Sequence, residues 1–215
     1  MIDFHTHSIL SDGVLIPSEL VRRARVAGYT AMAITDHVDE SNIEQVIRQL
    51  IKVSAQINTD KTFTLVPGVE LTHIPLKHIP KMVKKARSLG ARIVVGHGET
   101  LSEPVEPGAN IAYIKARVDV LAHPGLITDE ECVLAVTNSV HLEITARGGH
   151  NTSNGHVASV AKRLGGLMLV NTDSHAPGDL ISDERALKVA LGAGLDEKDF
   201  RRIQKNAKQL LEKVR

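Results

Sequence analysis

Histidine and carboxylate side chains recur along the chain at the points where short apolar runs end. His5 and His7 follow the first run, and Asp173 and His175 follow the last. On an extended segment, side chains two residues apart point to the same side, so each pair can present two donor atoms to one ion. Imidazole nitrogens and carboxylate oxygens suit zinc, iron or manganese. Asp12 also follows the first run, and further candidates follow the runs in between: Asp36, His37, Glu70, His97 and His123.

These donors outnumber the needs of a single ion. A carboxylate can bridge two ions. Glu70 is the candidate bridge because it is the only carboxylate that the end of the third apolar run contributes to the cluster. Taken singly, Asp12, Asp36 and His97 fit ordinary roles as helix caps or hydrogen-bonded residues. For the whole set, ordinary roles would mean that most of the 11 histidines lie at the same end of the runs by coincidence. The pattern therefore predicts a centre with more than one metal ion.

The remaining histidines are interpreted differently. Ordinary structural roles are the better interpretation for His73 and His78, which lie in a loop, and for His141, which starts a strand. His150 and His156 stay open, because they follow the sixth predicted strand and lie beside the predicted site.

The apolar runs predict the scaffold that positions these side chains. Seven β-branched runs alternate with amphipathic helical patterns. The predicted strands are residues 1–4, 30–35, 62–69, 92–96, 118–122, 140–146 and 167–171. Units of about 25 to 33 residues are typical of parallel βαβ construction, either closed as a barrel or open and doubly wound. In a closed barrel the first and last strands are neighbours and all carboxyl ends face one mouth, which would bring the donors together.

Capping signals indicate where the helices begin and end. Expected helix starts are Pro17 ahead of Ser18, Ser41 with Glu44, Thr128 with Glu131, and Asp196 with Asp199. Gly28, Gly90 and Gly165 indicate helix ends.

Length and charge narrow the class of protein. A chain of 215 residues, 42% hydrophobic and 24% charged, suits one folded domain with a sizeable core. Twenty-six Lys and Arg against 25 Asp and Glu leave a net charge of +1, which gives no electrostatic reason to expect a nucleic-acid or anionic-membrane partner. With no Trp, two Tyr and three Phe, the chain also has few of the aromatic faces that single-stranded nucleic-acid binders use.

Cysteine usage and hydropathy predict a cytoplasmic protein. Cys132 is the only cysteine, so an internal disulfide and a multi-cysteine zinc site are both excluded, and a reducing compartment fits. No apolar run approaches the ~18 residues of a membrane span, and the first residues lack a signal-peptide pattern. We therefore expect no membrane partner.

Six motifs occur in order along the chain. They are DFHTHSILSDG at the start, AITDH ending at His37, PGVE ending at Glu70, VGHG around His97, LAHPG around His123 and NTDSH ending at His175. The His-Thr-His tripeptide alone is a weak signal, but six ordered motifs are highly specific. The set resembles the PHP (polymerase and histidinol phosphatase) family of metal-dependent phosphoesterases. The resemblance implies one domain over residues 1–215, folded as a distorted (β/α)7 barrel.

The resemblance also implies three metal positions at the carboxyl end of the barrel. The first position would take His5, His7, Glu70 and Asp173, the second Glu70, His97 and His123, and the third Asp12, His37 and His175. Some relatives have His where this chain has Asp12, so occupancy of the third position stays open. The implied cofactors are two to three divalent ions of zinc, manganese or iron, and the residues expected to take part directly in catalysis are Glu70, Asp173 and His175.

The sixth predicted strand adds candidates for substrate binding. By alternation Arg147 lies nearest the mouth, and its planar fork matches phosphate oxygens. An ion pair between Glu143 and Arg147, or a solvated Arg147, is an equally good interpretation. His150 is the second candidate. Arg185 is a weaker one, for which an ordinary place on a surface helix is favoured.

The predicted activity is hydrolysis of a phosphate ester by a metal-activated hydroxide, without a covalent enzyme intermediate. The expected substrate is a small phosphomonoester, histidinol phosphate-like or a nucleotide, with nucleic acid bound only as a short oligonucleotide substrate. An amidohydrolase acting on C–N bonds is one alternative. Against it, no Lys follows the fourth predicted strand, where a carbamylated Lys would bridge the metal ions of such an enzyme. The other alternative is a non-catalytic metal-stabilised module, and the complete ligand set argues against it.

Overall fold

Short parallel strands with both faces buried form the centre of the structure. Every residue of β2 (Ala31–Ile34), β5 (Ile93–His97) and β7 (His141–Thr145) is buried. This burial is expected where helices cover one face of the strands and side chains fill the interior behind the other. The computed structural model describes residues 1–215.

The strands form a nearly closed barrel. The others are β1 (Ile2–Asp3), β3 (His37–Val38), β4 (Thr64–Leu71), β6 (Val120–Ala122) and β8 (Met168–Asn171). All pairings are parallel in the order β1-β2-β4-β5-β6-β7-β8, and β3 pairs with the second half of β4. The β3 segment continues the second predicted strand after a break at Thr35 and Asp36, so the barrel has seven strand positions. The (β/α)7 prediction is confirmed.

The first and last strands meet, as the closed barrel requires. A parallel bridge joins Thr6 to Ser174, and the amide of His7 donates a 2.8 Å hydrogen bond to the carbonyl of Ser174. The Thr172 hydroxyl donates to a carboxylate oxygen of Asp3 at 2.6 Å. These bonds hold the segments that carry the two predicted ligand pairs side by side.

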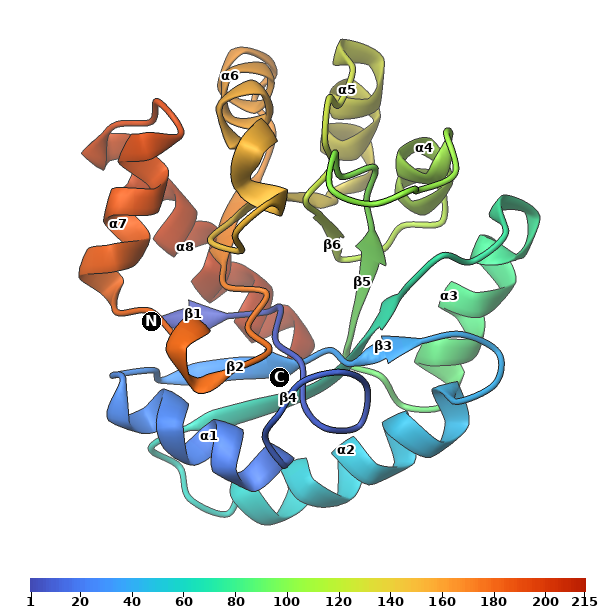
Figure 1. Ribbon diagram of the computed structural model, residues 1–215, viewed down its shortest axis with the longest axis vertical. Helices are drawn as coiled ribbons and strands as arrows, with labels where there is room; N and C mark the ends of the chain where they lie inside the picture. The colour runs from blue at the N-terminus through green and yellow to red at the C-terminus, as the bar shows by residue number, and fades with distance from the viewer.

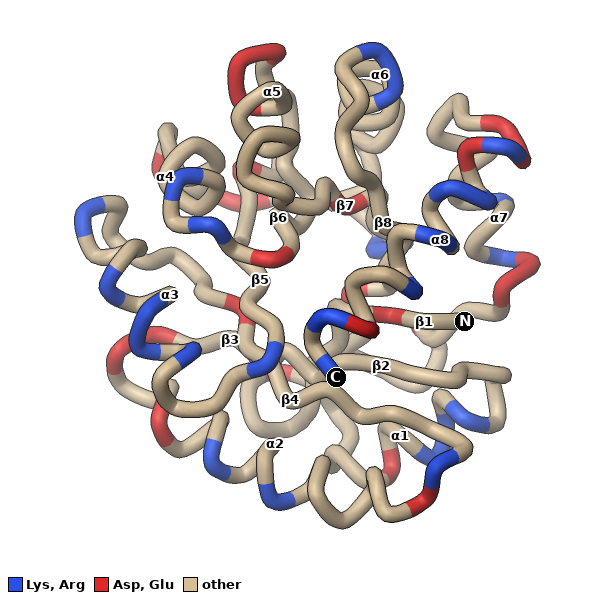
Figure 2. The backbone as a smooth tube through the Cα atoms, turned by 180° about the vertical axis from the view of Figure 1, so that it is seen from behind, with Lys and Arg blue, Asp and Glu red and all other residues tan.

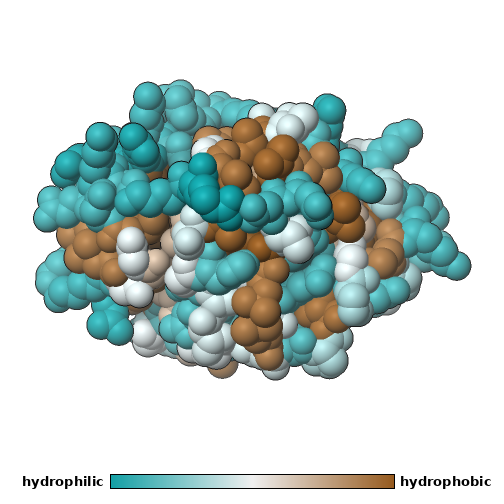
Figure 3. Space-filling view, turned by 90° about the horizontal axis from the view of Figure 1, so that it is seen from above, coloured by the Kyte–Doolittle hydropathy of each residue, from teal (hydrophilic) through white to brown (hydrophobic).

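Helices surround the barrel (Figure 1). They are α1 (Pro17–Val26), α2 (Ile43–Ile57), α3 (Ile79–Ser88), α4 (Ala109–Lys115), α5 (Asp129–Asn138), α6 (Asn154–Leu164), α7 (Asp183–Gly192) and α8 (Glu197–Val214), with short 3-10 turns η1 (Leu76–His78), η2 (His150–Ser153) and η3 (Pro177–Asp179). Most Lys and Arg lie on these helices (Figure 2). On the face shown in Figure 3, apolar side chains lie in separate patches bordered by hydrophilic ones. None of the helices is long and apolar enough to cross a membrane.

Most helix boundaries agree with the capping signals. Thr128 and Asp196 each form a complete capping box, and α1 begins at Pro17. The three predicted terminal glycines follow their helices with φ values between 76° and 102°. The prediction for Ser41 is wrong, because α2 begins at Ile43 after Asn42. The Ser41 hydroxyl is already engaged with the Asp39 carboxylate, so it does not cap the helix.

The amino end of the barrel interior is apolar and is closed by α8. Phe4, Val66 and Leu169 belong to a buried cluster inside the strands, which Leu210 and Val214 of α8 join. In the view of Figure 1, α8 lies behind the strands, at the end away from the predicted mouth. The interior is therefore divided into an apolar half sealed by one helix and a half that can hold polar groups.

We expect Leu210→Ala to destabilise the protein without changing its metal content. Leu210 is 2% exposed, and losing its side chain from this cluster should cost about 2 to 5 kcal/mol of unfolding free energy. Thermal or denaturant unfolding measures the loss. Leu191→Ala, at a side chain that is 45% exposed, is the control and should change stability little. Wild-type stability in Leu210→Ala would show that α8 does not seal the barrel.

Candidate metal centre

The carboxyl ends of the strands bring all nine predicted ligands together. Donor atoms within 4.8 Å of one another define five groups, and four of these consist only of predicted ligands. These four groups are His5, His7 and Glu70; His5, His123 and Asp173; Glu70, His97 and His123; and His7, Asp12, His37 and His175.

Four side chains from the first two groups, His5, His7, Glu70 and Asp173, form a buried core. His5 Nε2 lies 3.3 Å from Glu70 Oε2, and His7 Nε2 lies 3.2 Å from Asp173 Oδ1. The crossed distances, from His5 to Asp173 and from His7 to Glu70, are both 3.7 Å. No side chain of the four is more than 3% exposed. Donor atoms spaced in this way can converge on one ion.

Glu70 faces two groups at once. Its Oε2 atom faces His5 at 3.3 Å, whereas its Oε1 atom lies 3.7 Å from His123 Nε2. This arrangement is the one that a bridging carboxylate needs. The group of Asp12, His37 and His175 is more open, because Asp12 is 56% exposed, although its Oδ1 lies 3.2 Å from His175 Nε2.

Buried donor atoms without partners show that the side chains fit metal ions. Most buried polar atoms in proteins are hydrogen-bonded, because an unpaired one is costly. Here the unpaired buried atoms include His5 Nε2, both nitrogens of His7, Glu70 Oε1, Asp173 Oδ1, and Nδ1 of both His97 and His123. Their concentration at one point, with nitrogen and oxygen donors mixed, suits transition-metal coordination.

The electrostatics of this cluster favour bound protons when no ion is present. Burial raises the pKa of Asp173 to about 7, despite the opposing charge of His5. Burial lowers the pKa of His37, but the charge and hydrogen bond of Glu70 outweigh it and raise that pKa to about 8. Burial raises the pKa of Glu70, as it does for Asp173. The charges and hydrogen bonds of His5 and His37 outweigh burial and hold the pKa of Glu70 well below its usual range.

Two of the predicted ligands have backbone conformations that side chains rarely adopt. His123 has a φ of 28° and Asp173 a φ of 51°. Strain of this kind persists where the surrounding structure fixes the geometry of a site. Gly98 beside His97 permits a close approach, since a Cβ there would lie 2.2 Å from the Ala122 carbonyl oxygen. Local backbone geometry thus aims the side chains at the mouth.

Glu143 of β7 supports the ligands from inside the barrel. Its Oε1 atom accepts hydrogen bonds from His5 Nδ1 at 2.8 Å and Asn171 Nδ2 at 2.9 Å, and its Oε2 atom accepts one from the His123 amide at 3.0 Å. The alternative ion pair between Glu143 and Arg147 is therefore wrong. Alternation along β7 places Glu143 toward the interior, where its carboxylate accepts the hydrogen bond from His5.

Asp36 holds the loop after β1. It accepts hydrogen bonds from the Ser8 amide and hydroxyl and from the Ser11 hydroxyl, at 2.7 to 2.8 Å. Asp36 belongs to none of the ligand groups, and its hydrogen bonds give it a structural role. The bonds restrain the loop on which His7 and Asp12 lie.

The two predicted substrate-binding residues lie at the mouth. Arg147 Nη1 lies 3.4 Å from Asp179 Oδ2, an atom that also accepts hydrogen bonds from the amides of His175 and Ala176. His150 stacks on His123 with ring centroids 4.4 Å apart. Its Nδ1 atom lies 2.7 Å from the Thr100 hydroxyl.

The other candidates have structural roles. His156 Nε2 bonds to the carbonyl of Ile127, His141 bonds to the carbonyl of Asp119, and Arg185 is exposed in the first turn of α7.

Sequence reasoning missed Glu103, on the loop between β5 and α4. Its Oε2 atom lies 3.0 Å from His97 Nε2 and 3.6 Å from His73 Nε2, so His73 belongs to the edge of the site. The hydrogen bond with His97 is the main cause that lowers the pKa of Glu103 to about 2. Glu103 belongs to none of the six motifs, and only its place in the loop that follows His97 could have suggested it.

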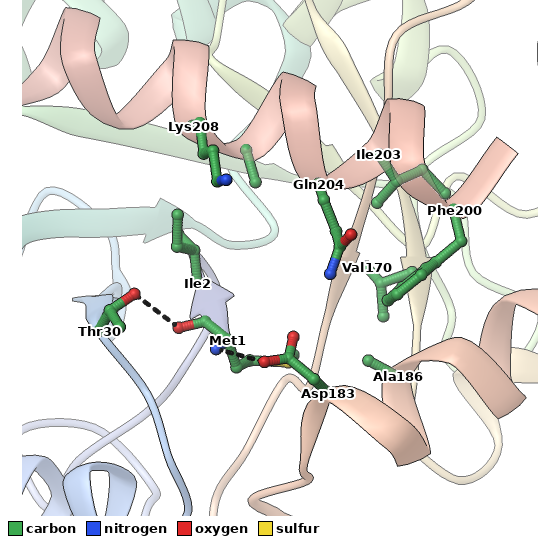
Figure 4. A pocket seen from close by; sticks show the side chains of 11 residues that line it. Met1, Ile2, Thr30, Val170, Asp183, Ala186, Phe200, Ile203, Gln204 and Lys208 are labelled. Carbon is green, nitrogen blue, oxygen red and sulfur yellow. Dashed lines mark hydrogen bonds and ion pairs between the residues drawn. The ribbon is translucent and has the colours of Figure 1, made fainter. Parts of the chain in front are cut away.

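A cavity of about 230 Å³ lies at the opposite end of the barrel, between β1, α7 and α8 (Figure 4). Ile2, Phe200 and Ile203 line it, and its one ion pair joins the Met1 amine to Asp183 at 2.8 Å. It has no cluster of unpaired donors. The metal centre is therefore the better candidate for the functional site.

Comparisons with known proteins agree with this geometry. The family model described as "PHP domain" matches residues 3–213. The uncharacterized protein MJ1295 of Methanocaldococcus jannaschii is 51% identical over 216 residues, covering 99% of both chains. A 5'-3' exoribonuclease of Haemophilus influenzae is 48% identical over 46 residues, which cover 19% of this chain and 17% of the relative.

Solved structures share the fold at low sequence identity. A chain from an archaeal ribonuclease P complex with mature tRNA has a TM-score of 0.75 at 17% identity and covers 100% of this chain and 91% of its own. A protein of Listeria monocytogenes, provisionally assigned as a histidinol phosphatase, has a TM-score of 0.62 at 11% identity, with coverage of 84% and 97%. At these identities the likeness concerns the fold alone.

We expect metal binding to release protons near neutral pH and to weaken on acidification. The raised pKa values of His37 and Asp173 mean that the metal-free site holds protons at pH 7, and an ion must displace them. Calorimetric titration with Mn²⁺ in buffers of different ionisation enthalpy should show release of about one proton or more per chain at pH 6.5 and less at pH 8.5. A binding enthalpy that is independent of the buffer at pH 6.5 would contradict this account of the site.

Proposed function

The chain belongs to the PHP domain family, and from that premise we propose that it hydrolyses a small phosphomonoester at a centre of two or three divalent metal ions. The observation that carries the proposal is the convergence of buried, unpaired donor atoms at one end of the barrel. A structural role alone does not account for so many unpaired groups, because their burial costs stability.

The ligand groups suggest which residues would hold each metal ion. His5, His7, Glu70 and Asp173 would hold one ion, Glu70, His97 and His123 a second, and Asp12, His37 and His175 a third. When bound, such ions supply an activated water and neutralise charge on the phosphoryl oxygens. Glu70 would fix the spacing of the first two positions, because its two oxygens face different groups. Asp173 and His175 would complete the side of the centre nearest the substrate.

Arg147 and His150 are placed to contact the substrate. Arg147 is part-exposed beside the loop of His175, so its guanidinium can turn from Asp179 toward a phosphate. His150 lies on the opposite flank, against His123, with its Nδ1 atom engaged by Thr100. Together they would orient the phosphate and the group attached to it.

The charges at the mouth favour a small substrate over a long polyanion. Asp12 and Glu103 are carboxylates at the rim with 56% and 38% of their side chains exposed. They would repel additional phosphates beyond the one under attack. The exoribonuclease relative makes the end of a short oligonucleotide the second candidate substrate.

A metal analysis followed by a phosphate-release screen tests the proposal. The purified protein should bind more than one transition-metal ion and release phosphate from at least one class among histidinol phosphate, nucleoside monophosphates, sugar phosphates and short oligonucleotides. Hydrolysis of amides without phosphate release would favour the amidohydrolase alternative. A metal-loaded protein that turns over no substrate of either kind would favour a non-catalytic module.

We expect Glu70→Gln to impair catalysis more than Asp12→Asn. Glu70 is buried and faces two ligand groups, whereas Asp12 belongs to one open group. The loss of kcat in Glu70→Gln should exceed the about 10- to 100-fold typical of changing a residue that only supports a ligand. Steady-state kinetics with metal content per chain measures it. Wild-type kcat in Glu70→Gln would rule out the bridging role.

We expect Arg147→Ala to lower kcat/KM while leaving the metals and the fold intact. Losing a charge-assisted contact with phosphate should cost about 2 to 4 kcal/mol, or about thirty- to thousand-fold. Arg147→Lys should recover only part, since it restores the charge but not the fork. Arg185→Ala is the control, and this exposed residue should change kcat/KM by less than about fivefold. Equal kcat/KM in Arg147→Ala and wild type would leave Arg147 as a partner of Asp179 only.

A further inference from the structure

We propose that Glu103 is a positioning residue, which holds the His97 ring by accepting a hydrogen bond from Nε2 and so leaves Nδ1 free to bind the second metal ion. The inference rests on the proposed function only in that His97 is taken as a metal ligand. It extends the site to a loop that none of the sequence motifs includes.

The two nitrogens of His97 have opposite surroundings. Nε2 lies 3.0 Å from the carboxylate of Glu103, whereas Nδ1 is buried without any hydrogen-bond partner. Histidines that bind metals usually donate their second ring N–H to a carboxylate or a carbonyl, which fixes the tautomer and the orientation of the ring. The partnered Nε2 and the unpaired Nδ1 of His97 fit that arrangement.

His5 provides an internal comparison. Its Nδ1 atom lies 2.8 Å from the carboxylate of Glu143, and its Nε2 atom is buried, unpaired and directed toward Glu70. Glu103 therefore supports His97 as Glu143 supports His5. The difference is that the carboxylate faces Nε2 in His97 and Nδ1 in His5. Two ligand groups of the centre would each have a carboxylate behind one histidine.

Other imidazoles hold the Glu103 carboxylate in place. Besides His97, the Oε2 atom faces His73 Nε2 at 3.6 Å, and the Oε1 atom faces His150 Nε2 at 3.5 Å. Thr100 orients the His150 ring through Nδ1. His73 adopts a φ of 50°, and its ring centroid lies 5.1 Å from that of His97. The ion pairs of Glu103 are all with histidines, so its carboxylate is committed to the metal centre although the loop is exposed.

Direct coordination of the second ion by Glu103 fits the geometry less well. The compact group that contains Glu103 consists of His73, His97 and Glu103, whereas the group of the second ion consists of Glu70, His97 and His123. Glu103 therefore lies on the outer side of the His97 ring. The competing arrangement is a separate outer ion held by His73, His97 and Glu103, and the experiment below distinguishes the two.

If Glu103 orients His97, the carboxylate that supports the second ion is accessible to solvent. Glu143 lies on a strand and is fully buried, while the Glu103 side chain is 38% exposed. Changing Glu103 should thus weaken one ion selectively and leave the buried first position unaffected.

Titration of the full-length, metal-free protein with Co²⁺ tests the proposal, because the visible spectrum reports coordination and metal analysis reports stoichiometry. Glu103→Ala should weaken one ion by about 10- to 100-fold, with the others unchanged. Glu103→Gln should recover part of the affinity, because its amide oxygen still accepts a hydrogen bond. Glu106→Ala, at an exposed glutamate of the same loop, is the matched control and should bind like wild type.

Three results would overturn the proposal. Wild-type affinity for every ion in Glu103→Ala would show that Glu103 does not position His97. Loss of one whole ion, from four in wild type to three in the variant, would make Glu103 a ligand of an outer ion. Wild type that binds no Co²⁺ would remove the metal centre altogether. Selective weakening in a protein that releases no phosphate would support the role of Glu103 and reject only the proposed function.

Discussion

The contact between the first and last strands is the interaction on which the site depends. The Thr6–Ser174 bridge and the hydrogen bonds of Asp3 with the Thr172 segment join chain segments separated by almost 170 positions. They bring His5 and His7 against Asp173, which completes a buried set of ligands. In an open sheet these residues would lie at opposite edges, and the remaining strands would supply only parts of a centre.

Barrel closure also explains how one interior can be both apolar and polar. Toward the amino end, Phe4, Val66 and Leu169 pack with α8 and supply hydrophobic stabilisation. Toward the carboxyl end, unpaired imidazoles and carboxylates are costly in the absence of an ion. The apolar half offsets the cost of the polar half, where His123 and Asp173 also adopt positive φ values that side chains rarely adopt.

The sequence predicted the barrel and the converging ligands because both depend on periodic signals. Strand burial follows from apolar runs, and ligands two residues apart on extended backbone share a side. The supports were not predictable in the same way. Alternation left an ion pair between Glu143 and Arg147 as one alternative, but in the closed barrel Glu143 faces His5. Glu103 and His73 lie on loops, where neither period nor motif indicates which way a side chain points. Ser41 met a capping pattern, but Asp39 competes for its hydroxyl.

The position of the ligands along the chain has a consequence for biosynthesis. His5 leaves the ribosome almost 170 residues before its partner Asp173, so a nascent chain that does not yet include the segment after β8 cannot assemble the first ligand group. Contacts so distant in sequence form slowly, since a long loop must close before they stabilise anything. Exposed histidines of the nascent chain would bind stray ions singly and weakly. The converging set of ligands therefore exists only in the closed barrel.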